Sequence, residues 1–359
     1  MERFGFIIHP IEAKRDVARK YPIAKFLPER MVEWAIKFKE PMLLSHIKGV
    51  TSLTGAQAEG WFVGCPLTPR QMGTLPLDFV YEKIIKAAQI AQEQGARVVG
   101  LGAHTSVVGD GGVTIAKNLD IAVTTGNSYT VATGIEGLLK AAEIMEIDLA
   151  SARGAVVGAA GSIGKTCARI LAKHVPELML VDLHLAQLDD VASQITAESD
   201  AVVKVFTEVH TGIKDADVII TVTSAVNAII HPGDIKSGAV ICDIARPRDV
   251  SRRVVEQRDD VLVIEGGVVS VPGDVEFGFD FGFPPKTAYA CMSETMILAL
   301  EGRYENFTLG KTVSVEQVTE ISSLAAKHGF KLAGFRSFEK AVSEEYIERI
   351  RNNAKRAKH

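Results

Sequence analysis

The stretch Gly154–Asp182, GAVVGAAGSIGKTCARILAKHVPELMLVD, predicts the fold of the middle of the chain. An apolar run ends at Val157 and is followed by glycines at positions 158, 161 and 164. A helical pattern then leads to a second apolar run that closes on Asp182. Strand, tight turn, helix and strand in this order form the βαβ unit that places a dinucleotide pyrophosphate over a helix N-terminus. We therefore expect a Rossmann domain here.

The spacing of the three glycines has a chemical reason. A pyrophosphate reaches backbone N–H groups only where no Cβ intervenes, so Gly158 and Gly161 open the turn, and Gly164 lets the helix lie close to the strand. Gly-x-x-Gly-x-x-Gly is looser than the usual fingerprint, and the flanking strands and the acidic residue supply the rest of the signal. The residues expected to contact the cofactor in this turn are Gly158, Ala159, Gly161, Ser162, Ile163 and Gly164.

Two other interpretations of the turn compete with this one. A glycine-rich turn in an ordinary α/β protein would look similar. Gly164-Lys165-Thr166 also resembles the end of a P-loop, but the position that must then be glycine is Ala159. The P-loop pattern fails by one residue, and we reject it.

The acidic residue at the end of the second strand bears on the choice of cofactor. The carboxylate of Asp182 can accept hydrogen bonds from both ribose hydroxyls and repels a 2′-phosphate. It therefore favours NADH over NADPH. His184 partly offsets this preference, because it can supply positive charge close by.

Composition narrows the class of protein. The chain has 359 residues, 47% of them hydrophobic, and a net charge of −4, which fits a compact protein of two or three domains and gives no general attraction for nucleic acid. Its longest apolar stretch, Val218–Ile230, is too short to span a bilayer, and the N-terminus shows no secretory signal. The cysteines lack zinc spacing, so we expect reduced thiols, no metal and a cytoplasmic protein.

Residues 1–150 read as an α/β domain of their own. An amphipathic helix over Leu77–Gln94 follows a proline-rich segment, Pro66–Pro76, that we expect to be a loop. Two later strands end in polar loops, and Asn127 or Ser128 can cap the helix that follows the second strand. Open α/β sheets bind ligands at such strand ends, although the same residues are ordinary in turns and caps. The substrate-side candidates in the first loop are His104, a turn histidine on the simpler interpretation, and Ser106.

Residues 151–285 complete the predicted dinucleotide-binding domain. The strand within Asp215–Val222 is expected to stand fourth, and the small residues after it, Thr223 and Ser224, leave room for a nicotinamide ring. The last strand runs into Gly266, Gly267 and Val268, where the backbone either approaches the ring or makes a plain turn. The aromatic segment Asp274–Pro285 suits a loop over an apolar pocket or a domain linker.

Residues 286–359 form the third predicted segment, with a buried helix over Thr287–Leu300 and a final helix over Phe338–His359. Cys291 lies near the start of the first helix, where the partial positive charge of the helix end lowers a thiol pKa and favours the nucleophilic thiolate. On composition alone, a cysteine between alanine and methionine is a small core residue. That is the interpretation for the other cysteines, Cys65, Cys167 and Cys242.

Several separated motifs change the interpretation of Cys291. The chain resembles the cyanobacterial long-chain acyl-carrier-protein reductases at the segments TTGNSYT, GAAGSIG and AYACMSETMILALEGRYENF. The resemblance runs from about residue 98 to Gly334 and is faint over the first sixty residues. Within it, Leu101–Ser106, Thr124–Thr130, Gly158–Gly164 and Cys291 with Glu294 correspond to motifs of the family.

This resemblance implies an activity. An acyl thioester, carried by acyl carrier protein or CoA, would acylate Cys291, and NAD(P)H bound over Gly158–Gly164 would then reduce the acyl group to a fatty aldehyde. The implied oxyanion is held by backbone N–H groups or by His104 or Ser106. Two departures stand out: Asp182 replaces a basic residue suited to NADPH, and Gly102-Ala103-His104 replaces a glycine-glycine-aromatic sequence.

Two further functions stay open from the sequence. One is an NAD-linked dehydrogenase of a small hydroxy or amino acid, in the manner of shikimate dehydrogenase, for which only Lys117 and Asp120 offer a proton-transfer pair. The other is a cofactor-binding regulator without chemistry. The basic end of the final helix, which includes Lys355 and Lys358, would dock an acidic carrier protein or simply complement the helix dipole. An aldehyde-consuming enzyme would be a further partner.

Overall fold

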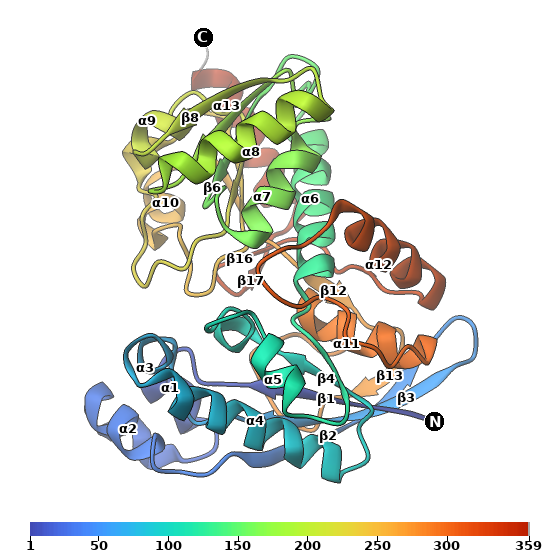
Figure 1. Cartoon of the computed structure of the whole chain (residues 1–359). Coiled ribbons are helices and arrows are strands. Elements are labelled where there is room, and N and C mark those ends of the chain that lie inside the picture. Colours follow the sequence, from blue (N-terminus) through green and yellow to red (C-terminus); the bar gives the residue numbers. More distant parts are fainter. Residues whose placement is uncertain (358–359) are drawn as a thin grey trace. The chain divides into compact units, whose positions relative to one another are not determined.

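The computed structural model describes residues 1–357, and these divide into two compact units. Unit 1 contains Met1–Tyr129, Val269–Thr312 and Thr319–Lys331. Unit 2 contains Thr130–Val268, Val313–Val318 and residues 332–357. These bounds differ from the predicted domain bounds of 1–150, 151–285 and 286–359, because the chain returns to unit 1 after residue 268. The α/β class, with a Rossmann sheet and C-terminal helices, is confirmed (Figure 1).

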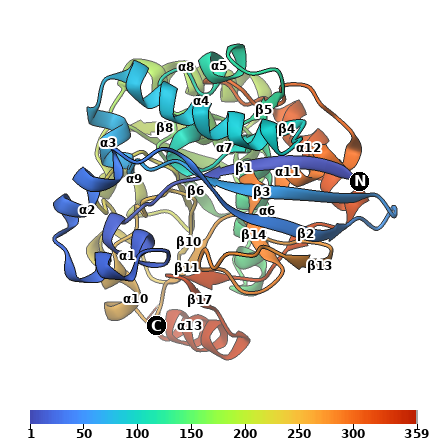
Figure 2. The ribbon, with the colours of Figure 1, turned by 90° about the horizontal axis from the view of Figure 1, so that it is seen from below.

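Unit 1 is built on a mixed sheet of order β13-β2-β3-β1-β4-β5. Strand β1 runs parallel to β3 and β4, β4 runs parallel to β5, and β2 and β13 join antiparallel at the other edge. Figure 2 shows β1, β3 and β2 side by side. The strands are β1 (Glu2–Ile8), β2 (Met42–Thr51), β3 (Gln57–Gly64), β4 (Val98–Leu101), β5 (Ala122–Thr124) and β13 (Gly273–Glu276).

Two helices cover opposite faces of this sheet, and two glycines allow their close approach. A Cβ at Gly5 would lie 2.4 Å from the Cβ of Ala91 on helix α4 (Leu77–Glu93). A Cβ at Gly100 would lie 2.0 Å from the Oγ1 of Thr295 on helix α11 (Ala290–Glu301). Gly5 pairs with Val99, one residue before Gly100, so the two glycines face opposite sides. Helix α11 therefore belongs to the first unit.

Smaller elements complete unit 1. Near the N-terminus, α1 (Ala13–Ala18), η1 (Pro22–Phe26) and α2 (Glu29–Ile36) follow one another. Three short helices flank the strand ends: α3 (Pro69–Thr74), η2 (Ala103–Ser106) and α5 (Val113–Lys117). The strands β14 (Thr287–Tyr289), β12 (Val268–Ser270) and β15 (Lys331–Leu332) pair in that order.

Unit 2 contains a parallel sheet of order β8-β7-β6-β9-β10-β11. Counted within the unit this is 3-2-1-4-5-6, the doubly wound dinucleotide-binding order, so the predicted fourth strand stands where it was expected. The strands are β6 (Arg153–Val157), β7 (Glu177–Val181), β8 (Val202–Phe206), β9 (Val218–Thr221), β10 (Val240–Asp243) and β11 (Leu262–Glu265).

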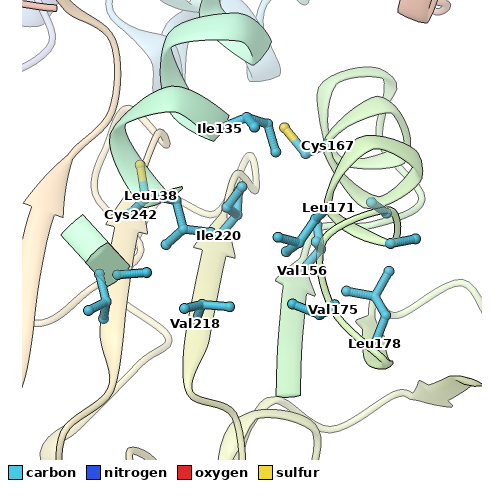
Figure 3. Close-up of a cluster of buried hydrophobic side chains, with 14 of the residues drawn as sticks. Ile135, Leu138, Val156, Cys167, Leu171, Val175, Leu178, Val218, Ile220 and Cys242 are labelled. Carbon is cyan, nitrogen blue, oxygen red and sulfur yellow. The ribbon is translucent and has the colours of Figure 1, made fainter. Parts of the chain in front are cut away.

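Apolar side chains fill both faces of the second sheet. Figure 3 shows one face, where Leu138 of α6 (Asn127–Ile144) and Leu171 of α7 (Ser162–Leu171) pack with Val156 and Ile220 of the strands. Cys167 and Cys242 lie in this core as buried thiols, as predicted. The other elements that fold with unit 2 are α8 (Leu185–Glu198), α9 (Val209–Ile213), η3 (Pro232–Asp234), α10 (Arg252–Gln257), β16 (Arg336–Ser337), β17 (Lys340–Ala341) and α13 (Glu344–Ala357).

Helix α12 (Val315–His328) carries the chain from the second unit back to the first. Among residues 1–357, no helix is both long enough and apolar enough to cross a membrane.

We expected the proline-rich segment Pro66–Pro76 to be a loop, but it contains a helix. This helix is α3, whose first residue is Pro69, where a missing N–H is harmless. Thr68 and Gln71 form a capping box, because each side chain accepts a hydrogen bond from the other's backbone N–H. The helix start signal was therefore present in the sequence and was hidden by the prolines.

Two predicted helix bounds are also wrong. The final helix begins at Glu344 rather than Phe338, because Phe338 and Glu339 have positive φ angles of 47° and 69° between strands β16 and β17. Lys358, part of the predicted basic end, lies outside the described residues. The helix that follows β5 begins at Asn127, so Asn127 and Ser128 lie inside it and neither precedes it as the expected cap.

We predict that Gly164→Ala destabilises the protein by roughly 1–3 kcal/mol, the usual cost of overpacking. An added Cβ would lie 2.0 Å from the carbonyl oxygen of Gly158, and backbone cannot move away as a side chain can. Urea unfolding measures the change. Gly233→Ala is the matched control in the same unit, because no heavy atom lies within 4 Å of its added Cβ. Equal stability of the two variants would contradict the close approach.

Candidate active site

Cys291 occupies the first turn of α11, directly after the short strand β14. It is partly exposed, whereas the other three cysteines are buried. A backbone hydrogen bond from Ala103 reaches its sulfur. Ala103 follows β4 in the loop that the sequence singled out, so that loop and the cysteine do meet within unit 1.

The loop after β5 also closes on Cys291. Gly126 has φ of +73°, and an added Cβ would lie 2.2 Å from the Cα of Cys291. Only glycine tolerates both the left-handed backbone and this contact. The loops after two neighbouring parallel strands therefore converge on one thiol, at the edge of the sheet where α/β proteins bind ligands.

Glu294 holds this arrangement together from inside the unit. Its carboxylate is fully buried and accepts hydrogen bonds from the Thr124 hydroxyl, from the Tyr129 backbone N–H at 2.9 Å and from the Thr308 hydroxyl at 3.0 Å. Burial raises the pKa of Glu294, and the hydrogen bonds oppose that rise. The side chain thus ties the cysteine helix to the loop after β5 and to the start of α6.

The thiol is not acidified, contrary to our expectation from its place at the helix start. Burial raises the pKa of Cys291 to about 11, and the negative charge of Glu294 acts in the same direction. The hydrogen bonds from Ala103 and from Met292 lower it, but by less. Desolvation outweighs the helix end here, so the resting sulfur is a protonated thiol.

The loop Ala103–Ser106 is shaped by a residue that the sequence analysis missed. The backbone N–H of His104 donates to Nε2 of His9 at 3.0 Å, and Nδ1 of His9 donates to the carbonyl of Pro10. Burial lowers the pKa of His9 to about 4, so it is neutral. His9 directly follows β1, and the strand-end argument applied to Ser106 would have found it too.

The two predicted side chains of this loop have different surroundings. The Ser106 hydroxyl donates to the carbonyl of Ala103 at 2.7 Å, so its proton is used within the loop. His104 is partly exposed, and burial lowers its pKa. His104 is thus the titratable residue next in sequence to Ala103, and the lowered pKa favours its neutral form.

Aromatic side chains form a row that ends beside the thiol helix. Phe62 of β3 contacts Phe277 and Phe281, Phe281 stacks on Phe283, and Phe283 meets Tyr289 at a centroid distance of 4.3 Å. Tyr289 is the residue that precedes α11. The segment Asp274–Pro285 thus packs into unit 1 through its phenylalanines, and its first residues belong to β13.

In unit 2 the glycine turn has the geometry that a pyrophosphate requires. Gly158 has φ of +84° and donates its N–H to the carbonyl of Val181 at 2.8 Å. Ala159 donates to the same carbonyl, and Gly161 immediately precedes α7, which begins with Ser162 and Ile163. The first N–H groups of a helix have no partner within it, so α7 presents donors at its N-terminus.

Asp182 stands where the sequence placed it, at the end of β7. Its carboxylate accepts hydrogen bonds from the Ala160 N–H at 3.2 Å and from the backbone and ring of His184 at 3.2 and 2.9 Å. It is 14% exposed, against 65% for His184. One carboxylate thus orders the glycine turn and still faces solvent.

A buried aspartate that we did not predict supports the residues after β9. Asp249 accepts hydrogen bonds from the hydroxyls of Thr221 and Thr223 and from the Thr223 N–H at 2.9 Å. Burial raises the pKa of Asp249. Thr223 also lies beside the glycine turn, 3.1 Å from an added Cβ on Gly158. Nothing in the local sequence signals this pairing, because the partners are far apart in the chain.

The other predicted contacts of unit 2 differ in exposure. Ser224 is exposed, Gly267 has φ of +76°, and Val268 is buried at the start of β12. The residues present fit a nicotinamide dinucleotide, because glycines at positions 158 and 164 let the turn pack closely on its neighbours and on α7. Added Cβ atoms there would lie 2.7 Å from the Val222 oxygen and 2.0 Å from the Gly158 oxygen.

Comparison with protein families matches part of unit 2. The family model for shikimate / quinate 5-dehydrogenase matches residues 140–265, which contain the glycine turn and the six-stranded sheet. Unit 2 is therefore a Rossmann domain of the NAD(P)-dependent oxidoreductase type. The structure of L-tryptophan dehydrogenase from Nostoc punctiforme is 13% identical, with a TM-score of 0.42, and the match covers 99% of this chain and 89% of that one.

Two relatives match nearly the whole chain. Aminotransferase PigE from Serratia sp. is 29% identical over 357 residues, covering 96% of this chain, which spans only 41% of the length of PigE. Long-chain acyl-[acyl-carrier-protein] reductase from Synechococcus elongatus is 26% identical over 352 residues, covering 91% of this chain and 98% of the reductase. The resemblance to the long-chain acyl-carrier-protein reductases that the sequence motifs predicted is thereby confirmed for a divergent chain.

Proposed function

We propose that this protein reduces an acyl thioester to an aldehyde, with Cys291 as the acylated residue and NAD(P)H as the reductant. The observation that carries the proposal is the convergence of the Ala103 and Gly126 loops on the sulfur-bearing turn of α11. Glu294 supports that turn from below. A core cysteine needs neither a partly exposed position nor two strand-end loops folded against it.

Acylation begins with loss of the thiol proton. His104, whose lowered pKa keeps it neutral, accepts the proton from Sγ of Cys291 as the sulfur attacks the thioester carbonyl. A bond forms from Sγ to the acyl carbon, and the bond from that carbon to the donor sulfur breaks. The departing thiolate takes the proton back from His104. The Ala103 N–H, which lowers the pKa of the Cys291 thiol, would stabilise negative charge at this centre.

Reduction of the acyl group follows acylation. NAD(P)H would supply the hydride that reduces the acyl carbon. Gly158, Gly161 and the first turn of α7 would hold its pyrophosphate, and Asp182 would bind the adenosine ribose. When the carbon–sulfur bond breaks, the aldehyde leaves and Sγ of Cys291 regains a proton from solvent. Thr223, which Asp249 fixes beside Gly158, would border the nicotinamide ring.

The donor is an acyl-carrier-protein or CoA thioester. The aromatic row from Phe62 to Tyr289 brings apolar side chains to within two residues of Cys291 in the sequence. Apolar ligand groups bind among such side chains, with a few polar groups fixing the reacting end. We assign this row to the acyl chain. His104 and the Ala103 N–H are then the polar groups at the reacting end.

A second candidate is the dehydrogenase of a small hydroxy or amino acid, because the family model for shikimate / quinate 5-dehydrogenase matches residues 140–265. That match lies almost entirely in unit 2 and concerns the cofactor domain. Lys117 and Asp120, the proton-transfer pair that this function would need, are both exposed. Incubation with NAD and shikimate-type hydroxy acids, beside NADH with acyl-CoA, separates the two functions by which substrate turns over.

We predict that Cys291→Ala abolishes acylation and aldehyde formation while leaving cofactor affinity unchanged, because it removes the only proposed nucleophile and lies outside unit 2. Intact mass after mixing with acyl-CoA, without reductant, measures acylation, and peptide mapping locates the acyl group. NADH fluorescence titration measures cofactor binding.

Cys65→Ala is the matched control for this experiment. Cys65 is a buried thiol of the same unit, and burial raises its pKa to about 12. The control variant should retain one acyl group on residue 291. An acyl adduct on the Cys291→Ala protein, or aldehyde made by it, would refute the proposal.

The pH dependence of alkylation tests the state of the sulfur. Since the thiol has a raised pKa of about 11, it is neutral near pH 7, and the thiolate fraction rises about tenfold per pH unit below that value. We predict that iodoacetamide labelling of Cys291 in the free enzyme accelerates about tenfold per pH unit, or about a hundredfold in all, between pH 7 and 9. Mass spectrometry of the peptide gives the rate. A plateau below pH 8 would show an acidified thiol instead.

Asp182 is expected to disfavour the 2′-phosphate of NADPH. We predict that Asp182→Asn shifts the ratio of dissociation constants about tenfold toward NADPH, which corresponds to roughly 1.4 kcal/mol. Asparagine keeps an acceptor for the Ala160 N–H. Fluorescence titration with both cofactors measures the ratio. Asp190→Asn, an exposed site on α8, makes the same change in net charge and should leave the ratio alone.

A further inference from the structure

The first helices of the chain have an unusual core. Elements α1, η1 and α2 pack on one another through small or branched side chains, all of them buried. The buried residues of this cluster are Ala13, Ala18, Ala24, Val32 and Ile36. The segment thus folds around modest side chains, and its larger apolar side chains are not needed for that core.

Those larger side chains point to solvent. Phe26 is 85% exposed, Ile23 70%, and Trp34 and Phe38 64% each. Met31 and Tyr21 are also exposed. Single exposed apolar residues are ordinary, but six within eighteen consecutive residues mark an interaction surface. We call this set, Tyr21, Ile23, Phe26, Met31, Trp34 and Phe38, the apolar surface.

The spacing of these residues places them on shared faces. Met31, Trp34 and Phe38 are separated by three and four residues, the spacing of one helix face, although Phe38 lies just beyond the end of α2. The rings of Trp34 and Phe38 meet edge to face at 5.3 Å. Ile23 and Phe26 are three apart in η1, where such side chains align.

The charge around the apolar surface opposes that of the whole chain. Residues 12–40 contain eight Lys or Arg and five Asp or Glu, whereas the chain as a whole carries −4. Of the acidic side chains, Glu33 is buried and paired with Arg70, so it contributes little to the surface. Lys37 lies 4.8 Å from the ring of Phe38. Basic and aromatic side chains are therefore interleaved.

We propose that this apolar surface docks on an anionic lipid bilayer. Exposed Trp, Phe and Ile insert at the boundary between headgroups and acyl chains, and Lys and Arg pair with anionic headgroups. No helix among residues 1–357 can span a bilayer, so the contact is peripheral. A second copy of the chain is the poorer occupant, because a two-fold contact would bring two basic surfaces together. This inference is independent of the proposed reaction.

Vesicle binding tests the proposal with a built-in reporter. The chain has two tryptophans, and Trp61 is 8% exposed while Trp34 is 64% exposed. Vesicles of phosphatidylcholine with 30% phosphatidylglycerol should co-sediment the protein and shift its tryptophan emission to the blue. Pure phosphatidylcholine should bind at least tenfold more weakly. Added salt should weaken binding to the anionic vesicles.

Matched variants separate the apolar surface from nonspecific adsorption. The double variant Trp34→Glu, Phe38→Glu should bind at least tenfold more weakly than wild type. The control Leu53→Glu, Val202→Glu makes the same charge change at positions 74% and 58% exposed and should bind like wild type. Trp34→Phe should bind without the blue shift. Circular dichroism and NADH titration verify that each variant is folded.

Three results would overturn the proposal. The first is equal binding to anionic vesicles by the double variant Trp34→Glu, Phe38→Glu and by its control. The second is that the wild-type protein does not co-sediment with vesicles and has a larger molecular mass in solution than the double variant. That result would identify self-association through the apolar surface. The third is a blue shift with a soluble acidic carrier protein but none with anionic vesicles.

Discussion

The carboxylate of Glu294 is the interaction on which the thiol site depends. Burying a carboxylate has an effective cost of several kcal/mol, and each hydrogen bond to a charged group returns roughly 1.5–3 kcal/mol. Its hydrogen bonds to Thr124, Tyr129 and Thr308 together contribute a free energy of the same order as this desolvation cost. The buried carboxylate is therefore stable only when all three bonds are made. Removing one partner would release the loop that Gly126 presses against α11.

Local patterns in the sequence were enough to predict the Rossmann unit. The glycine turn and the position of Asp182 follow from residues within about thirty positions of one another, and the alternation of strands and helices gives the strand order around β6. The thiol site was predicted through motifs, which included Glu294. Two supporting residues were not predicted: His9, which accepts a hydrogen bond from the loop of Ala103 in unit 1, and Asp249, which holds Thr223 in unit 2. No pattern in the sequence indicates either pairing.

Two errors show where local reasoning is insufficient. The prolines of Pro66–Pro76 suggested a loop, although Pro69 at a helix start and the Thr68–Gln71 box were compatible with α3. The helix end at Cys291 suggested an acidic thiol, but the sign of a pKa shift depends on burial, which sequence spacing does not report. At α3 the capping box outweighed the tendency of prolines to form loops. At Cys291 desolvation outweighed the effect of the helix N-terminus on the thiol pKa.

A neutral resting thiol changes what the surrounding loop must do. If the sulfur ionises only as it attacks, the Ala103 N–H and a proton acceptor have to be in position beforehand. A neutral thiol carries no negative charge that would draw them into place. Ala103 has φ of 46°, a left-handed conformation that costs a non-glycine residue about 1 kcal/mol. The bond from the His104 N–H to His9 fixes the next peptide and opposes relaxation of that backbone. The neutral His9 imidazole, held as an acceptor by its own burial, is thus part of how the thiol is kept ready.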